Sequence, residues 1–365
     1  MATVYRAENV GSLLRPQVVL EARKARVEGR MSAEALQEIE DQAVLDALEL
    51  QRKAGLDVFT DGELRRGSFL SGMADSVEGF VPDKIVMEWH GPGGGNEASA
   101  AQVVGGKLRQ KHRLTTHEIG FLQQHAPGAF KITIPAPSNF PDVSFKPGVT
   151  DRFYPTRSAL LQEITDIIHA EVLDAVDSGV PYVQLDAPRY AYYVDERISA
   201  QMRTRGIDPD LALDEAIAAD NASLAGAKRD GVTLAIHLCR GNSRSRWMAE
   251  GGYEPIAAKV FGSLAVDAFL LEYDTERAGG FEPLRFVPND KTVVLGLVTT
   301  KEPRLEAQDA LIRRIDEASR YVPMERLALS TQCGFASIAA GNLISFDDQR
   351  RKLELVADTA RKVWS

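Results

Sequence analysis

Short apolar, β-branched segments alternate along this chain with segments of helical periodicity, and this pattern predicts an α/β protein built as a (β/α)8 barrel. No fixed-period repeat and no linker of changed composition interrupts the 365 residues. The chain contains 44% hydrophobic and 26% charged residues, which is typical of a globular protein, and a single barrel with long loops can reach this length. We therefore expect residues 1–365 to form one domain.

Eight segments have the length and composition of buried parallel strands, which read as nearly continuous apolar runs when helices cover both faces of the sheet. These segments are Asn9 to Leu13, Leu56 to Thr60, Phe130 to Ile134, Tyr182 to Asp186, Val232 to Leu238, Ala268 to Tyr273, Thr292 to Thr299 and Leu327 to Thr331.

Helical periodicity follows several of these strands. The predicted helices include Ala33 to Lys53, Ser158 to Ser178, Leu211 to Lys228 and Leu305 to Tyr321. Ser32 is an N-cap residue for the first of them and Gly55 a terminating residue. The strand–helix alternation therefore holds over most of the chain.

Residues 74–118 interrupt the alternation between the second and third strands. The segment is rich in glycine and lacks helical periodicity, so we expect an inserted hairpin over one barrel face. Residues 139–156 contain Phe140, Pro141, Phe145, Pro147 and Tyr154 and are expected to form a second long loop over the same face.

Charge and cysteine content exclude several classes of protein. The 43 Lys and Arg residues against 52 Asp and Glu give a net charge of −9, which disfavours nucleic acid as a partner. The N-terminus does not resemble a signal peptide, and no apolar run approaches the roughly 18 residues of a membrane span, so a cytoplasmic location is predicted. Two cysteines are too few for a disulfide framework.

Catalytic side chains of (β/α)8 barrels lie at the C-terminal ends of the strands. In this chain those ends carry Gly11-Ser12, Asp61-Gly62-Glu63, Asp186, His237-Leu238-Cys239, Glu272, Lys301 and Cys333-Gly334. Both cysteines of the protein are in this set. The pattern therefore places the chemistry on one rim of the barrel.

His237 and Cys239 are two residues apart, so on an extended strand their side chains point to the same side. Glu272 and Cys333 would converge on the same rim, and one nitrogen, one oxygen and two sulfur ligands suit Zn²⁺. Taken alone, His-x-Cys is a weak signal, because a buried cysteine is usually a small hydrophobic residue. Two thiolates and a carboxylate would leave the site at net −1, which suits holding a substrate thiol as a nucleophilic thiolate. Alkyl transfer to sulfur is the chemistry that this site favours.

Six motifs occur in order over nearly the whole chain. They are V-G-S-L-L-R-P at Val10 to Pro16, D-G-E-L-R-R at Asp61 to Arg66, V-Q-L-D at Val183 to Asp186, H-L-C at His237 to Cys239, L-L-E at Leu270 to Glu272 and Q-C-G-F at Gln332 to Phe335. In these motifs the sequence resembles the C-terminal catalytic barrel of the cobalamin-independent methionine synthase superfamily.

The resemblance implies roles for residues at the rim. The zinc ligands would be His237, Cys239, Glu272 and Cys333. The backbone of Gly11 and Ser12, with Glu63 and Asp186, would hold the polar end of an amino-acid thiol such as homocysteine. A salt bridge at the barrel rim is the alternative role for Glu63 and Asp186.

Three departures from the family pattern bear on the alkyl donor. Lys301 replaces the histidine that protonates the leaving folate, the tryptophan that packs on the pterin is absent after the third strand, and Ala187 follows Asp186 where the family tends to have glutamate. The chain also has one barrel where full-length synthases have two. It is therefore more similar to the short, single-barrel branch, which includes the epoxyalkane:coenzyme M transferases.

Two further roles are predicted. Arg240, in the H-L-C-R-G-N run, would pair with an anionic substrate group, or would form a surface salt bridge. Lys301 would stabilise or protonate the leaving group. Glu272, the hardest ligand, would be the one displaced when the substrate sulfur binds.

The sequence therefore predicts a zinc-dependent thiol S-methyltransferase, with homocysteine as the expected thiol substrate. A methyl-pterin, a methylcorrinoid or another methylated compound would be the donor. Thiol addition to an epoxide, with a thiol like coenzyme M, is the alternative within the same chemistry. A non-catalytic zinc protein and a barrel lyase related to uroporphyrinogen decarboxylase, with incidental cysteines, are the alternatives from other classes. The oligomeric state, a homo-oligomer included, is left open.

Overall fold

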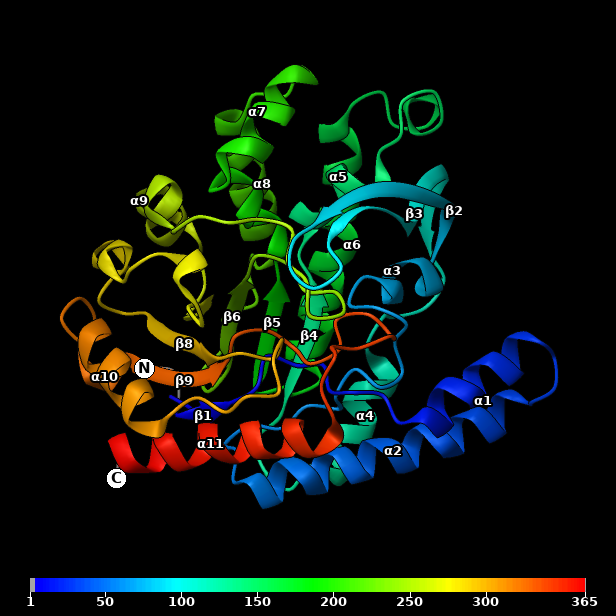
Figure 1. Ribbon diagram of the computed structural model, residues 1–365. Helices are drawn as coiled ribbons and strands as arrows, with labels where there is room; N and C mark the ends of the chain where they lie inside the picture. Colours follow the sequence, from blue (N-terminus) through cyan, green and yellow to red (C-terminus); the bar gives the residue numbers. More distant parts are fainter. Residues whose placement is uncertain (1–3, 365) are drawn as a thin grey trace.

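The computed structural model describes residues 4–364 and shows an α/β fold around a curled parallel sheet (Figure 1). Within these residues the sheet has seven strands in the order β1-β9-β8-β7-β6-β5-β4, and every neighbouring pair is parallel. The strands are β1 (Ala7–Glu8), β4 (Lys131–Pro135), β5 (Tyr182–Asp186), β6 (Thr233–Leu238), β7 (Ala268–Glu272), β8 (Thr292–Val298) and β9 (Leu327–Thr331).

Six of the eight predicted strands agree with the structure to within one residue at each end, and two differ more. The first strand is β1, which ends before Asn9. The predicted strand at Leu56 to Thr60 forms only one isolated parallel bridge, between Phe59 and Phe130. The amide of Thr60 bonds instead to the side chain of Gln51, 2.9 Å away, which prevents a longer ladder.

The segment around Phe59 nevertheless joins the two edges of the sheet. The amide of Asp57 donates to Ala7 O of β1 at 2.9 Å, and the amide of Lys131 in β4 donates to Phe59 O at 2.8 Å. This segment therefore occupies the position of an eighth strand while forming less regular hydrogen bonds than the other seven.

A buried ion pair lies inside the curled sheet. Lys131 Nζ of β4 lies 2.6 Å from Glu8 Oε2 of β1 and 2.8 Å from Gln184 Oε1 of β5. The side chains of Lys131 and Glu8 are 0% and 1% exposed, so each charge depends on the other.

Helices cover the outside of the sheet (Figure 1). The α-helices are α1 (Gln17–Val27), α2 (Ala33–Ala54), α3 (Ser71–Ser76), α4 (Thr116–His125), α5 (Phe140–Ser144), α6 (Arg157–Asp177), α7 (Glu196–Thr204), α8 (Pro209–Ser223), α9 (Glu254–Ser263), α10 (Gln308–Ala318) and α11 (Phe346–Trp364). Short 3₁₀ helices lie at Pro137–Asn139, Thr150–Arg152, Pro188–Tyr193, Glu276–Ala278, Glu282–Phe286 and Met324–Arg326. Among the helices of residues 4–364, none has the length and apolar character needed to cross a membrane.

The predicted caps of α2 are confirmed. Ser32 Oγ accepts from the amide of Ala35, and Gly55 ends the helix with a φ of 85°, a conformation that glycine adopts without a steric penalty. The predicted helix at Leu211 to Lys228 is shorter than expected, because α8 ends at Ser223, and α10 is likewise shorter than Leu305 to Tyr321.

The predicted insertion contains a hairpin of two long antiparallel strands, β2 (Val77–Trp89) and β3 (Gly95–Gln110). The hairpin covers fewer residues than the predicted insertion at 74–118, because α3 precedes the hairpin and α4 begins at Thr116. The hairpin lies beside α3 and α5 in Figure 1, and Phe80 of β2 packs against Phe140 of α5 with ring centroids 6.4 Å apart. The predicted loop at 139–156 thus contains a short helix that supports the hairpin.

Candidate metal centre and active-site cavity

A cavity of about 560 Å³ lies between the C-terminal ends of the strands and the β2–β3 hairpin. The strand ends and the loops that follow them contribute its polar wall, formed by Ser12, Glu63, Asp186, His237, Cys239 and Cys333. The hairpin contributes much of the apolar wall through Phe80, Ile85, Met87 and Trp89. The hairpin therefore covers the rim on which the sequence places the chemistry.

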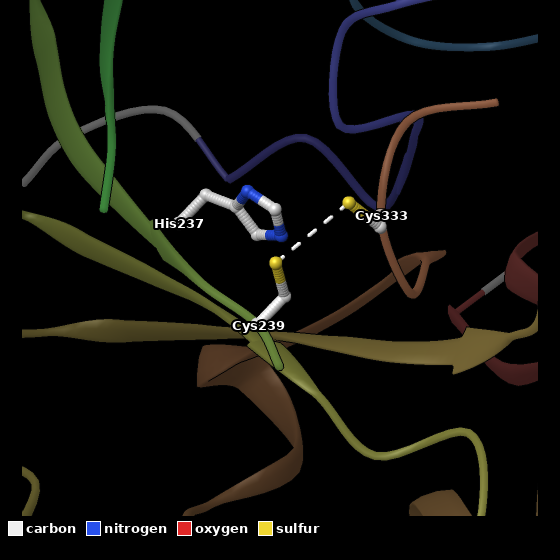
Figure 2. A group of neighbouring side chains, drawn as sticks. All are labelled: His237, Cys239 and Cys333. Atoms are coloured by element: carbon white, nitrogen blue, oxygen red, sulfur yellow. Dashed lines mark hydrogen bonds between the residues drawn. The ribbon is translucent and has the colours of Figure 1, made fainter. Parts of the chain in front are cut away.

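His237, Cys239 and Cys333 lie together at this cavity. His237 is near the end of β6, Cys239 follows the same strand, and Cys333 comes two residues after β9. One ligand atom from each lies within 4.8 Å of the others, and all three residues are buried. Figure 2 shows the two sulfur atoms and the imidazole ring pointing toward one another.

The sulfur atoms of Cys239 and Cys333 are 3.8 Å apart. A disulfide requires about 2.05 Å, so the cysteines are free. Two thiolates bound to one tetrahedral zinc ion at about 2.3 Å each are separated by about 3.8 Å. The spacing of the thiols therefore fits two zinc ligands.

The imidazole of His237 has the orientation of a metal ligand. Its Nδ1 lies 3.3 Å from Asp186 Oδ1. Its Nε2 is buried and has no hydrogen-bond partner among the residues that the structure describes. Metal-binding histidines commonly bind the ion through one nitrogen and a carboxylate through the other. The His237, Cys239 and Cys333 group therefore fits zinc in its donor types, its spacing and its unpartnered nitrogen.

The charges at this group favour a thiolate. Burial opposes a charge on His237, but its contacts with Asp186 and Cys333 raise its pKa to about 10. The pKa of Cys333 is held well below its usual value by the contact with Cys239, against burial, and further by His237 and Lys301. Without metal, both shifts favour the charged forms, a protonated His237 and a deprotonated Cys333.

Glu272, the remaining predicted ligand, lies outside the three-residue group. Its Oε1 accepts from Arg277 Nε at 2.8 Å, and its Oε2 accepts from the amide of Arg240 at 2.7 Å. Burial would raise its pKa, but the charges of Arg277, Arg240 and Lys301 lower it to about 2. Glu272 is therefore an ionised carboxylate whose two oxygens both accept hydrogen bonds. Its charge also raises the pKa of Cys239.

The predicted thiol-binding residues meet on one side of the cavity. Ser12, Glu63 and Asp186 line it, and a Cβ on Gly11 would lie 2.8 Å from Glu63 Oε1, so only glycine fits beside that carboxylate. Glu63 Oε1 accepts from Thr133 Oγ1 at 3.0 Å. Its Oε2 is buried without a partner in the part of the chain that the structure describes. Glu63 thus has an unsatisfied acceptor at the cavity.

Glu63 is held in an unusual state by its surroundings. Burial raises its pKa to about 7, with the charge of Asp186 adding to the effect and Arg66 opposing it. Its backbone has a φ of 53°, a left-handed conformation that is uncommon for glutamate. A cationic group bound at Oε2 would favour the ionised form.

Arg240 does not have the position predicted for it. It is 1% exposed and does not line the cavity, so neither the substrate contact nor the surface salt bridge is present. Its guanidinium donates to the carbonyl oxygens of Gly251, Glu272 and Ala278 and lies 4.1 Å from the Tyr253 ring centroid. Arg240 therefore joins loops behind the metal group.

Lys301 also lies behind the cavity wall. Its ammonium donates to Gly241 O at 3.0 Å and Asn242 Oδ1 at 2.8 Å, and these two residues line the cavity. Lys301 therefore contacts the cavity wall through these two residues. Its positive charge adds to the effects of Cys239 and His237, which lower the pKa of Cys333.

Trp89 and Arg189 are among the cavity residues that were not predicted from the sequence. Trp89 lies in the hairpin, where nothing in the local pattern indicated which side chains face inward. Arg189 lies in the loop after β5, three residues beyond Asp186. Its position after a strand end was the available signal for it, as for the other rim residues.

Comparisons with known proteins agree with this geometry. The model of the family described as cobalamin-independent synthase, catalytic domain, matches residues 6–346. An uncharacterized Bacillus subtilis protein, YxjH, is 38% identical over 99% of this chain and 95% of its own length. A methionine synthase of Pyrococcus abyssi is 24% identical over 89% of this chain and 84% of its own length.

A solved structure supports the fold. The structure of a B12-independent methionine synthase from Shewanella sp. W3-18-1, in complex with selenomethionine, aligns with 99% of this chain and 98% of that chain. The TM-score is 0.77 at 19% sequence identity. From the extent of the family match and the clustered motif residues, we conclude that the chain belongs to the cobalamin-independent methionine synthase family.

Proposed function

We propose that this protein is a zinc-dependent thiol alkyltransferase that methylates homocysteine. The observation that carries the proposal is the group of His237, Cys239 and Cys333, with its sulfur atoms 3.8 Å apart and its unpartnered imidazole nitrogen at a cavity of about 560 Å³. Methyl transfer to homocysteine is the activity of the family. The scaffold proposed is a single-domain (β/α)8 barrel over residues 1–365, with the segment around Phe59 in the eighth position.

His237, Cys239, Cys333 and Glu272 would hold the zinc ion. Each oxygen of Glu272 accepts one hydrogen bond, and a carboxylate oxygen retains a further lone pair for a metal. When bound, zinc would lower the pKa of a substrate thiol and keep it as a nucleophilic thiolate. The imidazole would be positioned by Asp186.

The protein's own groups would orient the thiol. The ammonium group of homocysteine would meet the unpartnered Oε2 of Glu63 and the carboxylate of Asp186, beside the backbone of Gly11 and Ser12. The apolar hairpin residues would exclude water from the reacting atoms. Lys301 would act on the leaving group by its charge, which is fixed behind Gly241 and Asn242.

The test is turnover with defined donors. Zinc-loaded protein is incubated with homocysteine or coenzyme M and, separately, methyltetrahydrofolate, methylcobalamin or a small epoxide, and the thioether product is identified by mass spectrometry. We expect methionine to form from a methyl donor and not after zinc is removed. Turnover with the epoxide alone would replace methyl transfer by epoxide opening and leave the zinc centre in place.

His237→Gln and Cys333→Ser are the matched variants for this assay. Both should lose turnover together with zinc content, measured by elemental analysis of the same samples. Full turnover by a zinc-free sample would contradict the proposed function. So would wild-type protein that binds zinc in full but shows no turnover with any donor.

A further inference from the structure

Arg189 lies in the wall between two cavities. It belongs to the short 3₁₀ helix after β5 and is only 7% exposed. It lines the 560 Å³ cavity and also a neighbouring cavity of about 340 Å³. Ile85, Met87 and Met248 line both cavities as well. Arg189 thus lies where the two spaces adjoin, together with these three apolar side chains.

Among the residues that the structure describes, none offers an acceptor oxygen to the guanidinium of Arg189. Its Nε has no hydrogen-bond partner among residues 4–364, and its Nη1 has only the sulfur of Met248 at 3.9 Å. The guanidinium carbon lies 4.8 Å from the Tyr192 ring centroid. Asp142, whose charge acts on Arg189, is itself paired with Arg157.

The other buried arginines of the described chain are satisfied. Arg15 and Arg240 donate to carbonyl oxygens, Arg66 pairs with Glu118, and Arg246 pairs with Glu97. A buried charge without a partner is costly, and arginine does not lose its proton to relieve the cost. Arg189 is therefore the exception, and a ligand in the cavity can supply the missing anion.

The carboxylates that line the second cavity, Glu88 and Asp142, are paired with Arg197 and Arg157. Glu63 and Asp186 line only the larger cavity, beside the metal group, and their negative charge suits an ammonium group there. Arg189 lies at the boundary with the second cavity, where Ile85 and Met87 provide an apolar wall. The planar guanidinium can donate two parallel hydrogen bonds to a carboxylate or sulfonate.

We propose that Arg189 binds the anionic group, a carboxylate or sulfonate, of the alkyl donor. The donor would then be an organic anion whose apolar body lies against the hairpin. The assignment of the anion to the alkyl donor rests on the proposed function, whereas the anion site itself rests on the contacts of Arg189.

The first test measures binding without turnover. Zinc-loaded protein is titrated calorimetrically with benzoate and with benzamide, which have the same shape but differ in charge. We expect the wild type to prefer benzoate by about tenfold, the Arg189→Met variant to lose the preference and the Arg244→Met variant to keep it. Arg244 lines the same cavity but is exposed, so this control removes an equal charge. No preference in the wild type, an unchanged preference in Arg189→Met or an equal loss in Arg244→Met would overturn the proposal.

The second test assigns the anion to one substrate. With the donor that supports turnover, Arg189→Met should raise the KM for that donor about tenfold and leave zinc content and the KM for the thiol unchanged. A rise in the thiol KM alone would overturn the assignment to the donor. If no donor supports turnover but the benzoate preference depends on Arg189, the anion site stands and the proposed function fails.

Discussion

Replacing Cys239 with serine is the most direct perturbation of the metal centre. The sulfur–sulfur distance of 3.8 Å fits two ligands of one zinc ion, so under the proposed function little reorganisation would offset the loss of one. Zinc sites with four ligands bind with apparent free energies of about 10–16 kcal/mol, or about 2.5–4 kcal/mol for each ligand. A serine hydroxyl is a poor replacement, and we expect zinc affinity to fall by about 60- to 900-fold.

Competition with a chromophoric chelator at fixed pH measures this affinity. Ser337→Ala is the matched control, because Ser337 Oγ lies 3.7 Å from Cys333 Sγ and lines the same cavity. The control should stay within about threefold of the wild type, and circular dichroism should show both variants folded. If Cys239→Ser also binds zinc within about threefold of the wild type, the metal centre has been assigned to the wrong residues.

Three more outcomes follow from buried groups. Because burial and then the charge of Asp186 raise the pKa of Glu63 to about 7, its carboxylate forms as pH rises through 7, and the KM for homocysteine should fall about tenfold from pH 6 to 8. Steady-state kinetics should show this fall flattened in Glu63→Gln, and an equal fall in the variant would contradict the role of Glu63. Arg240→Met should lower the free energy of unfolding by about 2–4 kcal/mol in denaturant titration, because carbonyl oxygens lose their donor; a raised KM with unchanged stability would instead indicate substrate contact. Lys131→Met should cost about 3–5 kcal/mol by leaving Glu8 unpaired, and adding Glu8→Gln should recover most of that loss, whereas no recovery would argue against the ion pair.

The strand segments were predictable because parallel strands under helices need nearly continuous apolar residues. Tyr182 to Asp186 and Leu327 to Thr331 have the observed boundaries. The Leu56 to Thr60 segment has the same composition but forms one bridge, because the Gln51 side chain takes the amide of Thr60. The side chain that takes this amide belongs to another element, so the composition of the strand segment alone does not reveal the difference.

The site was predictable to the extent that strand ends are. The rule that barrel chemistry lies at those ends places His237, Cys239 and Cys333 on one rim, where the structure has them. It could not place Arg240 or Lys301, because residues just after a strand can turn toward the cavity or behind its wall. That choice depends on acceptors from distant loops, such as Gly251 O for Arg240.

The β2–β3 hairpin belongs to one uninterrupted stretch of sequence, whereas the metal group is assembled from strand ends far apart in the chain. The apolar cover of the cavity and the thiol-activating residues are therefore encoded in separable parts of the gene. Exchange of one short coding segment can reshape that cover in a single evolutionary step while the metal group, Glu63, Asp186 and Arg189 stay in place. The same separation makes the hairpin the natural segment to exchange in engineering new alkyl donors.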